Sequence, residues 1–287
     1  MHSINPRQAQ VWIEQTRGGR LLRQIMWVAA GLLLAGLIAA LLKPGAISIG
    51  AWLGRWLGWL ILLGLLAAAW TMVIYQRRTA RLLSRAGEAV QLEQWDQAER
   101  ELKRLLRRGI RPPTARAEVL LWAAALAEHH HRYDAVQVLL EAVVNEPIGS
   151  ARQQFEASVG LAAALFRNEQ LSDAVQWISR LRRRELPEAM RAAVEAVALL
   201  GELLMGQHAS AAEAAETRRA LFRRHLSTAA GYSYGLMAAA FDRLGQQQRA
   251  AEFWHDATLL IEPARLVHRV AELADLAERY RPAERPL

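Results

Sequence analysis

Apolar and polar positions divide the chain into two parts with different patterns. From position 25 to 75, apolar residues run almost without interruption, and Lys43 and Arg55 are the only charged side chains. From position 76 onward, charged residues are interspersed with apolar ones at the spacing typical of amphipathic helices. The pattern therefore predicts a membrane part followed by a helical part that faces water.

Two segments of the apolar part are long enough to cross a bilayer. Residues 25–42 are 18 uncharged positions, and a helix of this length covers roughly 27 Å. Pro44 and Gly45 then end this helix, and a second apolar run extends from position 56 to 75. Because the connection is short, we predict a transmembrane hairpin over 25–76. A cleaved signal peptide fits less well, since a long segment precedes the first run and no clear cleavage site separates the two runs.

Basic residues flank both ends of this hairpin. Those before it are Arg7, Arg17, Arg20 and Arg23, and those after it are Arg77, Arg78, Arg81 and Arg85. The positive-inside bias places both termini in the cytoplasm, with the hairpin in a bacterial inner membrane. Positions 77–116 hold 11 basic and 5 acidic residues, whereas positions 117–287 hold 19 and 22. We expect the second group of arginines to face anionic lipid headgroups. Binding of nucleic acid is not favoured, because this basic region lacks interleaved aromatic residues for stacking on bases.

Three glycines in the second half of the hairpin, Gly50, Gly54 and Gly58, are spaced four apart. Small residues at this spacing let another helix approach closely. Packing of the hairpin against itself is the favoured interpretation. The alternative is a docking face for a foreign membrane helix or for a second copy of the chain, which would make a homo-oligomer.

The water-facing part repeats itself every 37 to 39 residues. Each unit begins with a polar turn and reaches an alanine, which we call the register alanine. The register alanines are Ala98, Ala135, Ala174, Ala211 or Ala212, and Ala250. Other small residues, Ala86, Ala123, Ala162 and Ala238, lie twelve positions earlier on a preceding apolar helix. Such self-similarity predicts helix pairs that cross closely and stack into a solenoid.

The last unit shows the clearest family features, with Tyr234, Met237, Ala238, Phe241 and Gly245 followed by Ala250, Trp254, Ala257 and Pro263. Positions 79–262 resemble the tetratricopeptide (TPR) repeat family. The resemblance implies an all-α fold, in which the transmembrane hairpin is followed by a TPR-like α-solenoid of about five helix pairs. The solenoid and its terminal capping helix are expected over 77–281, between a basic cytoplasmic segment (1–24) and a short tail (282–287). This plan also resembles inner-membrane proteins with a two-span hairpin and TPR units, some of them associated with haem biosynthesis, although the likeness is one of architecture.

The sequence carries no recognised catalytic motif. It contains no cysteine, which excludes disulfides and thiolate metal sites, and no HExxH, Walker A or GxSxG pattern. His129, His130 and His131 are adjacent, but consecutive histidines point in different directions on a helix. We therefore interpret them as a solvated turn rather than a metal site. We expect no catalytic residues, no metal and no cofactor.

Binding of partner proteins is the remaining function. In the TPR register, the inner face would display polar or aromatic side chains where neighbouring units carry alanine or leucine. These are Glu128, Glu156, Phe166, Arg167, Tyr232, Asp242 and Arg243. The sequence thus predicts a non-catalytic, membrane-anchored scaffold or adaptor that takes a peptide or helix of a partner into this groove. The alternative is an accessory structural subunit of a membrane enzyme or of a secretion or transport complex, docked through its hairpin.

Overall fold

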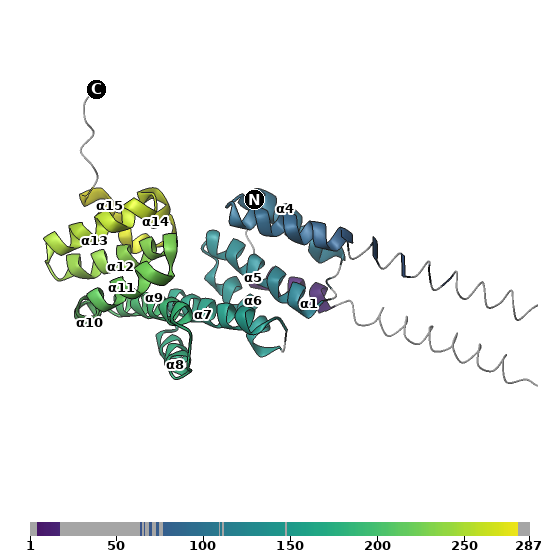
Figure 1. Cartoon of the computed structure of the whole chain (residues 1–287), viewed down its shortest axis with the longest axis horizontal. Helices are drawn as coiled ribbons and strands as arrows, with labels where there is room; N and C mark the ends of the chain where they lie inside the picture. Colours follow the sequence, from purple (N-terminus) through teal and green to yellow (C-terminus); the bar gives the residue numbers. More distant parts are fainter. Residues whose placement is uncertain are drawn as a thin grey trace, which may run out of the picture.

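The computed structural model describes residues 5–17, 77–108, 110, 112–146 and 148–280, together with positions 64, 66, 69, 70, 73 and 74. This described part is helical throughout and contains no strand, which confirms the all-α prediction (Figure 1). No helix within it is long and apolar enough to span a bilayer. The first predicted span, the glycines at 50, 54 and 58, and the tail at 282–287 lie outside the described residues.

Successive helix pairs form the array. The first pair consists of residues 77–91 and α4 (Trp95–Arg108). It is followed by α5 (Pro113–His129) with α6 (Tyr133–Asn145), and by α7 (Ala151–Arg167) with α8 (Leu171–Arg182). In the fourth pair, α9 (Glu188–Leu204) packs on a second helix divided into α10 (His208–Glu213) and α11 (Ala215–His225). After the 3-10 turn η1 (Ser227–Ala229), α12 (Ala230–Arg243) and α13 (Gln247–Leu260) complete the pairs. The described part of the chain continues through α14 (Pro263–Arg269) and the 3-10 turn η2 (Ala271–Leu273) to α15 (Ala274–Arg279).

The predicted register is confirmed by burial. Ala98, Ala135, Ala174, Ala211 and Ala250 are all fully buried, as are the small residues twelve positions before most of them. A methyl side chain at these points allows the first helix of each pair, called helix A, to cross the second at short distance. The periodicity of the sequence therefore fixes which face of each helix enters the core.

The turn between the two helices of a pair repeats a left-handed residue. In successive pairs this residue is Glu93, His131, Glu169, Gly206 and Gly245. The angle φ lies between 54° and 72° in all of them. Only glycine adopts this conformation without a steric penalty, so the acidic and histidine residues are held there by the pairs they join. The turn geometry is thus common to the array although its residue type is not.

Replacing Glu169 with glycine is therefore expected to raise the free energy of unfolding by up to ~1 kcal/mol, because the left-handed backbone is relieved. Gly245→Ala is expected to lower it by a similar amount, since a Cβ is added at φ 72°. Urea unfolding followed by circular dichroism measures both changes. Equal and same-signed effects of the two substitutions would contradict this account of the turn.

The N-terminal helix α1 (Pro6–Arg17) belongs to the folded array. It packs on α6 and α4 and buries Ala9, Trp12 and Ile13 in their core. Nε of Arg116 donates a hydrogen bond to Oγ1 of Thr16 at 2.8 Å, and the same arginine forms an ion pair with Glu146 at 2.7 Å. The segment predicted as a separate cytoplasmic stretch (1–24) is thus part of the solenoid core over these residues.

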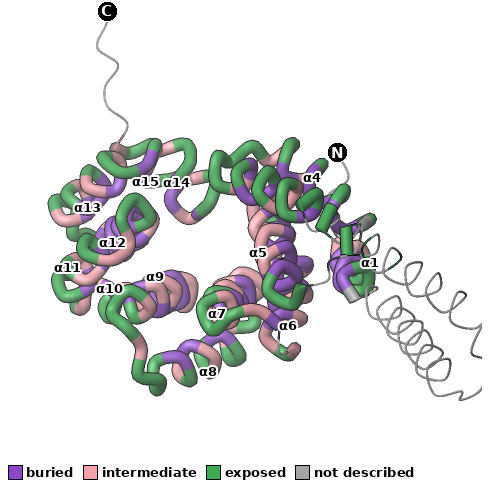
Figure 2. Tube along the Cα trace, turned by 45° about the vertical axis from the view of Figure 1, so that its right-hand side comes forward, coloured by how far each residue is buried: buried purple, intermediate pink, exposed green. Residues whose placement is uncertain are grey.

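The buried residues form two core clusters. The first extends from α1 to α8 and the second from α9 to α15, with α9 contributing side chains to both. In Figure 2 the array curves until α14 lies close to the turn before α4 and to the end of α5, where Arg265 contacts Glu93 and His268 contacts His129. The solenoid therefore closes on itself, which the repeat pattern alone does not predict.

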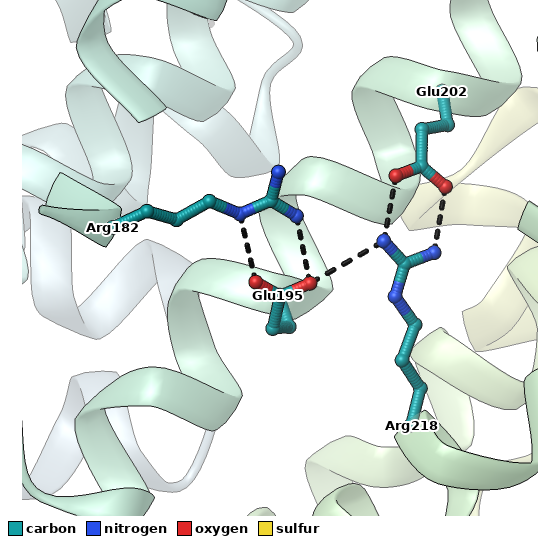
Figure 3. Close-up of polar contacts among 4 residues, drawn as sticks. All are labelled: Arg182, Glu195, Glu202 and Arg218. Atoms are coloured by element: carbon teal, nitrogen blue, oxygen red, sulfur yellow. Dashed lines mark hydrogen bonds and ion pairs between the residues drawn. The ribbon is translucent and has the colours of Figure 1, made fainter. Parts of the chain in front are cut away.

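A buried ion-pair network joins α8, α9 and α11 at the start of the second cluster (Figure 3). Arg218 donates to both carboxylate oxygens of Glu202 at 2.6 Å and contacts Glu195 at 3.3 Å. Arg182 donates to both oxygens of Glu195 at 2.8 and 2.7 Å. Burial lowers the pKa of Arg218, but the hydrogen bonds and charge of Glu202, followed by Glu195, outweigh it and raise the pKa overall. The network thus links both α8 and α11 to α9.

Large apolar side chains lie exposed just before the first pair. Leu66, Trp70, Val73 and Ile74 are helical, and between 36% and 68% of each residue's surface is exposed. The four arginines predicted to face lipid, Arg77, Arg78, Arg81 and Arg85, follow them and are exposed as well. A run of exposed apolar residues next to exposed cations is unusual for a surface in contact with water alone.

Candidate functional site

The inner face of the ring borders a partly open cavity of about 380 Å³, which we call the central cavity. Four helices of the A type, α5, α7, α9 and α12, supply most of its wall, with further residues from α6, η1 and α14. Small side chains such as Ala125, Ala163, Ala193 and Ala196 form the floor. The space exists because these positions carry alanine where a larger side chain would fill it.

Four of the seven groove residues predicted from the sequence line this cavity: Glu128, Glu156, Arg167 and Tyr232. They come from α5, α7 and α12, so the curvature of the array brings together residues separated by about a hundred positions. The prediction is wrong for Phe166, which is 3% exposed and lies in the first core cluster. Its ring covers Gly201 on α9, where any Cβ would lie 2.2 Å from Cζ. One residue along the helix therefore separates the groove from the core.

Asp242 and Arg243 do not line the central cavity. Asp242 accepts a hydrogen bond from Arg279, and Arg243 lies 3.8 Å from Asp275. Both partners belong to α15. These two residues thus attach the capping helix to α12, and the prediction that they face a partner in the groove is not supported by their place in the fold.

Oppositely charged side chains meet at one end of the central cavity. Arg269 of α14 donates to Oε1 of Glu128 at 3.1 Å, and its guanidinium lies over the ring of Tyr232, 4.7 Å from the centroid. Nη1 of Arg167 donates to both oxygens of Glu272 at 2.6 and 2.8 Å. Burial favours a raised pKa for Glu272, but the hydrogen bonds from Arg167 and the backbone lower it overall. This end of the cavity is therefore occupied by side chains from the C-terminal segment.

The opposite end is acidic. Glu156 lines the cavity and pairs with Arg152 at 2.8 Å on its outer side. Glu118 lies close enough on α5 that the Glu156 charge contributes, after burial, to raising its pKa. A cationic group of a partner would be favoured here, because it would relieve the repulsion between two carboxylates.

A histidine cluster that the sequence could not show lies beside the first end. Nε2 of His268 is 3.2 Å from Nδ1 of His129, and the ring centroids of His268 and His131 are 4.9 Å apart. Trp95 stacks on His129 with centroids 4.5 Å apart. The divergence of consecutive histidine side chains indicates a solvated turn, and that interpretation leaves out His268, which lies 139 positions after His129 in the sequence. A fold in which the ends of the solenoid meet is the signal that would have revealed it.

The cavity has the features of a binding surface. Its wall offers an apolar floor, the acidic Glu156 at one end and paired charges at the other. In the described part of the chain, no group of three or more histidine, cysteine or acidic side chains is arranged to hold a metal ion.

Comparison with known protein families, curated proteins and solved structures finds no match to this chain.

Proposed function

We propose that this protein is a membrane-anchored, non-catalytic scaffold that recruits a partner protein at the cytoplasmic face through the central cavity. The observation that carries the proposal is the cavity itself, lined by four A-type helices and by Glu128, Glu156, Arg167 and Tyr232. Concave faces of helical-pair solenoids are suited to holding a peptide or a partner helix. An alanine floor with charged ends fits a segment that has small apolar residues and a basic residue toward Glu156.

The anchor is supported by where the described flanks lie. Residues 6–17 and the helices after position 77 share one core, so they must stand on the same side of any membrane that the intervening chain crosses. The number of crossings is then even, as for a hairpin over 25–76. The exposed Leu66, Trp70, Val73 and Ile74 are in keeping with a helix that continues into lipid, with the adjacent arginines toward anionic headgroups.

Substitutions that fill the central cavity test whether the partner binds there. Ala163 and Ala196 lie in its wall and are half-buried, so Ala163→Arg with Ala196→Arg introduces two long cations without displacing core side chains. We expect at least a tenfold loss of the soluble protein that co-purifies with the full-length chain from native membranes in mild detergent. Ala189→Arg is the matched control, because Ala189 lies exposed on α9 outside the cavity. Unchanged retention in the double variant would refute recruitment through the cavity.

The same purification separates the scaffold from the alternative of an accessory subunit docked through its hairpin. Gly54→Leu with Gly58→Leu would block close helix approach in the membrane. A scaffold keeps its soluble partner in this variant. Loss of membrane-protein partners from a chain that still inserts would instead assign the docking function to the hairpin.

A further inference from the structure

Within the described residues, the two ends of the solenoid meet through four side-chain pairs, which we call the seam. Each joins the C-terminal segment α14–η2 to an early helix pair over a long sequence distance. The pairs are Arg265 with Glu93, His268 with His129, Arg269 with Glu128, and Glu272 with Arg167. They span between 105 and 172 positions. The seam therefore decides whether the array is a closed ring or an open curve.

The seam is formed by side chains and not by a packed core. The apolar residues of the C-terminal segment, Leu266, Leu273 and Leu276, are buried in the second cluster. Among the described residues, the first cluster draws no member from this segment. Two of the three ion pairs in the seam are about half exposed, so solvent screens them and each contributes little to holding the ends together. The seam can thus separate while both clusters and the helices of α12–α15 remain packed.

Histidines are the groups in the seam that change charge near neutral pH. His268 contacts His129 at 3.2 Å, and its ring lies 4.9 Å from those of both His129 and His131. A neutral pair can share one hydrogen bond between a ring N–H and a ring nitrogen. Two protonated rings have no acceptor to share and repel each other at this distance.

The surrounding charges do not offset that repulsion. Titratable and charged groups face the three rings from every neighbouring element. They are Glu93 before α4, Glu128 and His130 at the end of α5, Tyr133 on α6, Arg167 on α7, Tyr232 on α12, Arg265 and Arg269 on α14, and Glu272 on η2. Each carboxylate in this set already pairs with one of the arginines. New imidazolium charges would therefore compete for partners that are in use.

We infer that the seam is a proton-sensitive gate, in which protonation of His129 and His131, which pack against His268, separates α14–η2 from α5–α7 and widens the side entrance of the central cavity. The closed ring holds these rings against one another, with His129 partly buried, which disfavours the charged form of His129 and His131. Opening separates the rings. The inference concerns access to the cavity, and it rests on the proposed function only for what then enters.

The same contacts determine whether a fall in pH favours the open or the closed ring. Burial first, and then the charge of His268, lower the pKa of His129 and His131 below the ordinary value of 6.5. Protons therefore bind more weakly to the closed ring than to the open one. The preference for the closed ring over the open one is therefore greatest above about pH 6.5, and it decreases as the pH falls below this value. The pair of Glu272 with Arg167 persists through this window, because the pKa of Glu272 is lowered.

The gate can be measured by the distance across the seam in the full-length chain, held in detergent or in a lipid nanodisc. The sequence has no cysteine, so Leu92→Cys and Ala264→Cys place two spin labels at exposed positions next to Glu93 and Arg265. We expect one short distance at about pH 7.5 and a second, longer one at about pH 5.5. The ratio of open to closed molecules should rise by about tenfold, the size of an ordinary coupling between sites.

Variants identify the groups responsible. His129→Gln, His131→Gln and His268→Gln together should remain closed at both pH values, and His268→Arg should be open already at about pH 7.5. His255→Gln, at an exposed histidine on α13, should behave as the parent chain does. An unchanged distance in the parent, opening of the triple variant at low pH, or loss of helical circular dichroism along with opening would each overturn the gate. No partner takes part, so this result is separate from that of the recruitment experiment.

Discussion

Replacing Glu202 with leucine is expected to lower the free energy of unfolding by about 3 kcal/mol or more. Only 8% of the Arg218 side chain is exposed, and Glu202 accepts two of its hydrogen bonds at 2.6 Å. Without that carboxylate, the guanidinium stays buried with Glu195 alone at 3.3 Å, and Glu195 is already engaged by Arg182. The cost arises from leaving a buried charge with too few partners, and urea unfolding followed by circular dichroism measures it.

Removing both charges separates this cause from simple loss of a contact. Glu202→Leu with Arg218→Met should recover most of the stability, because no uncompensated charge remains between α9 and α11. Arg191→Ala is the surface control. Arg191 pairs with Glu188 at 3.4 Å with both side chains more than half exposed, so its loss should change stability by less than ~0.5 kcal/mol. A double variant as unstable as Glu202→Leu would show that packing, and not charge, is the main contribution.

A methyl group at Gly201 is expected to cost about 2 kcal/mol. The added Cβ would lie 2.2 to 2.7 Å from three atoms of the Phe166 ring, so ring and helix must move apart where the two core clusters adjoin. The same substitution should be neutral or slightly stabilising when Phe166 is alanine, since alanine favours a helix over glycine by roughly 0.5–1 kcal/mol. The two effects are therefore non-additive, and a double-mutant cycle of Gly201→Ala with Phe166→Ala measures their coupling.

Gly160 provides a matched control for this cycle. It lies on α7, also a helix of the A type, but a Cβ there would meet only the terminal Cδ1 of Leu140 at 3.0 Å. A flexible leucine can rotate away, so Gly160→Ala should cost little. If Gly201→Ala were as mild as Gly160→Ala, Phe166 would not be the rigid contact that holds the two clusters together.

Local sequence patterns determined much of this fold because a helix repeats its faces every few residues. Spacing within single units is enough to place the register alanines and the turn between the two helices of each pair. It also places the inner face that carries Glu128, Glu156, Arg167 and Tyr232. Phe166 shows the limit of that reasoning. It neighbours Arg167 on α7, and a rotation of the helix by one residue exchanges groove for core.

The sequence alone does not predict contacts between residues that are far apart along the chain. The packing of α1 on α6, the bidentate contact of Arg218 with Glu202 and the histidine cluster completed by His268 each require knowing which helices meet. In the last two cases the side chains are ordinary surface types, so composition gives no signal of a partner. The contact partner of a charged or histidine side chain is determined by the tertiary arrangement of the helices.

The sequence by itself determined an all-helical array of about five pairs, its register and the helix faces that enclose a central groove. The tertiary structure alone decided that the array closes into a ring and that a polar seam joins its ends. The physical reason lies in how a solenoid curves. Each unit adds a small rotation set by packing against its neighbour, and the position of α14 relative to α5 is the sum of all of them. A pattern within one unit therefore does not predict this accumulated rotation.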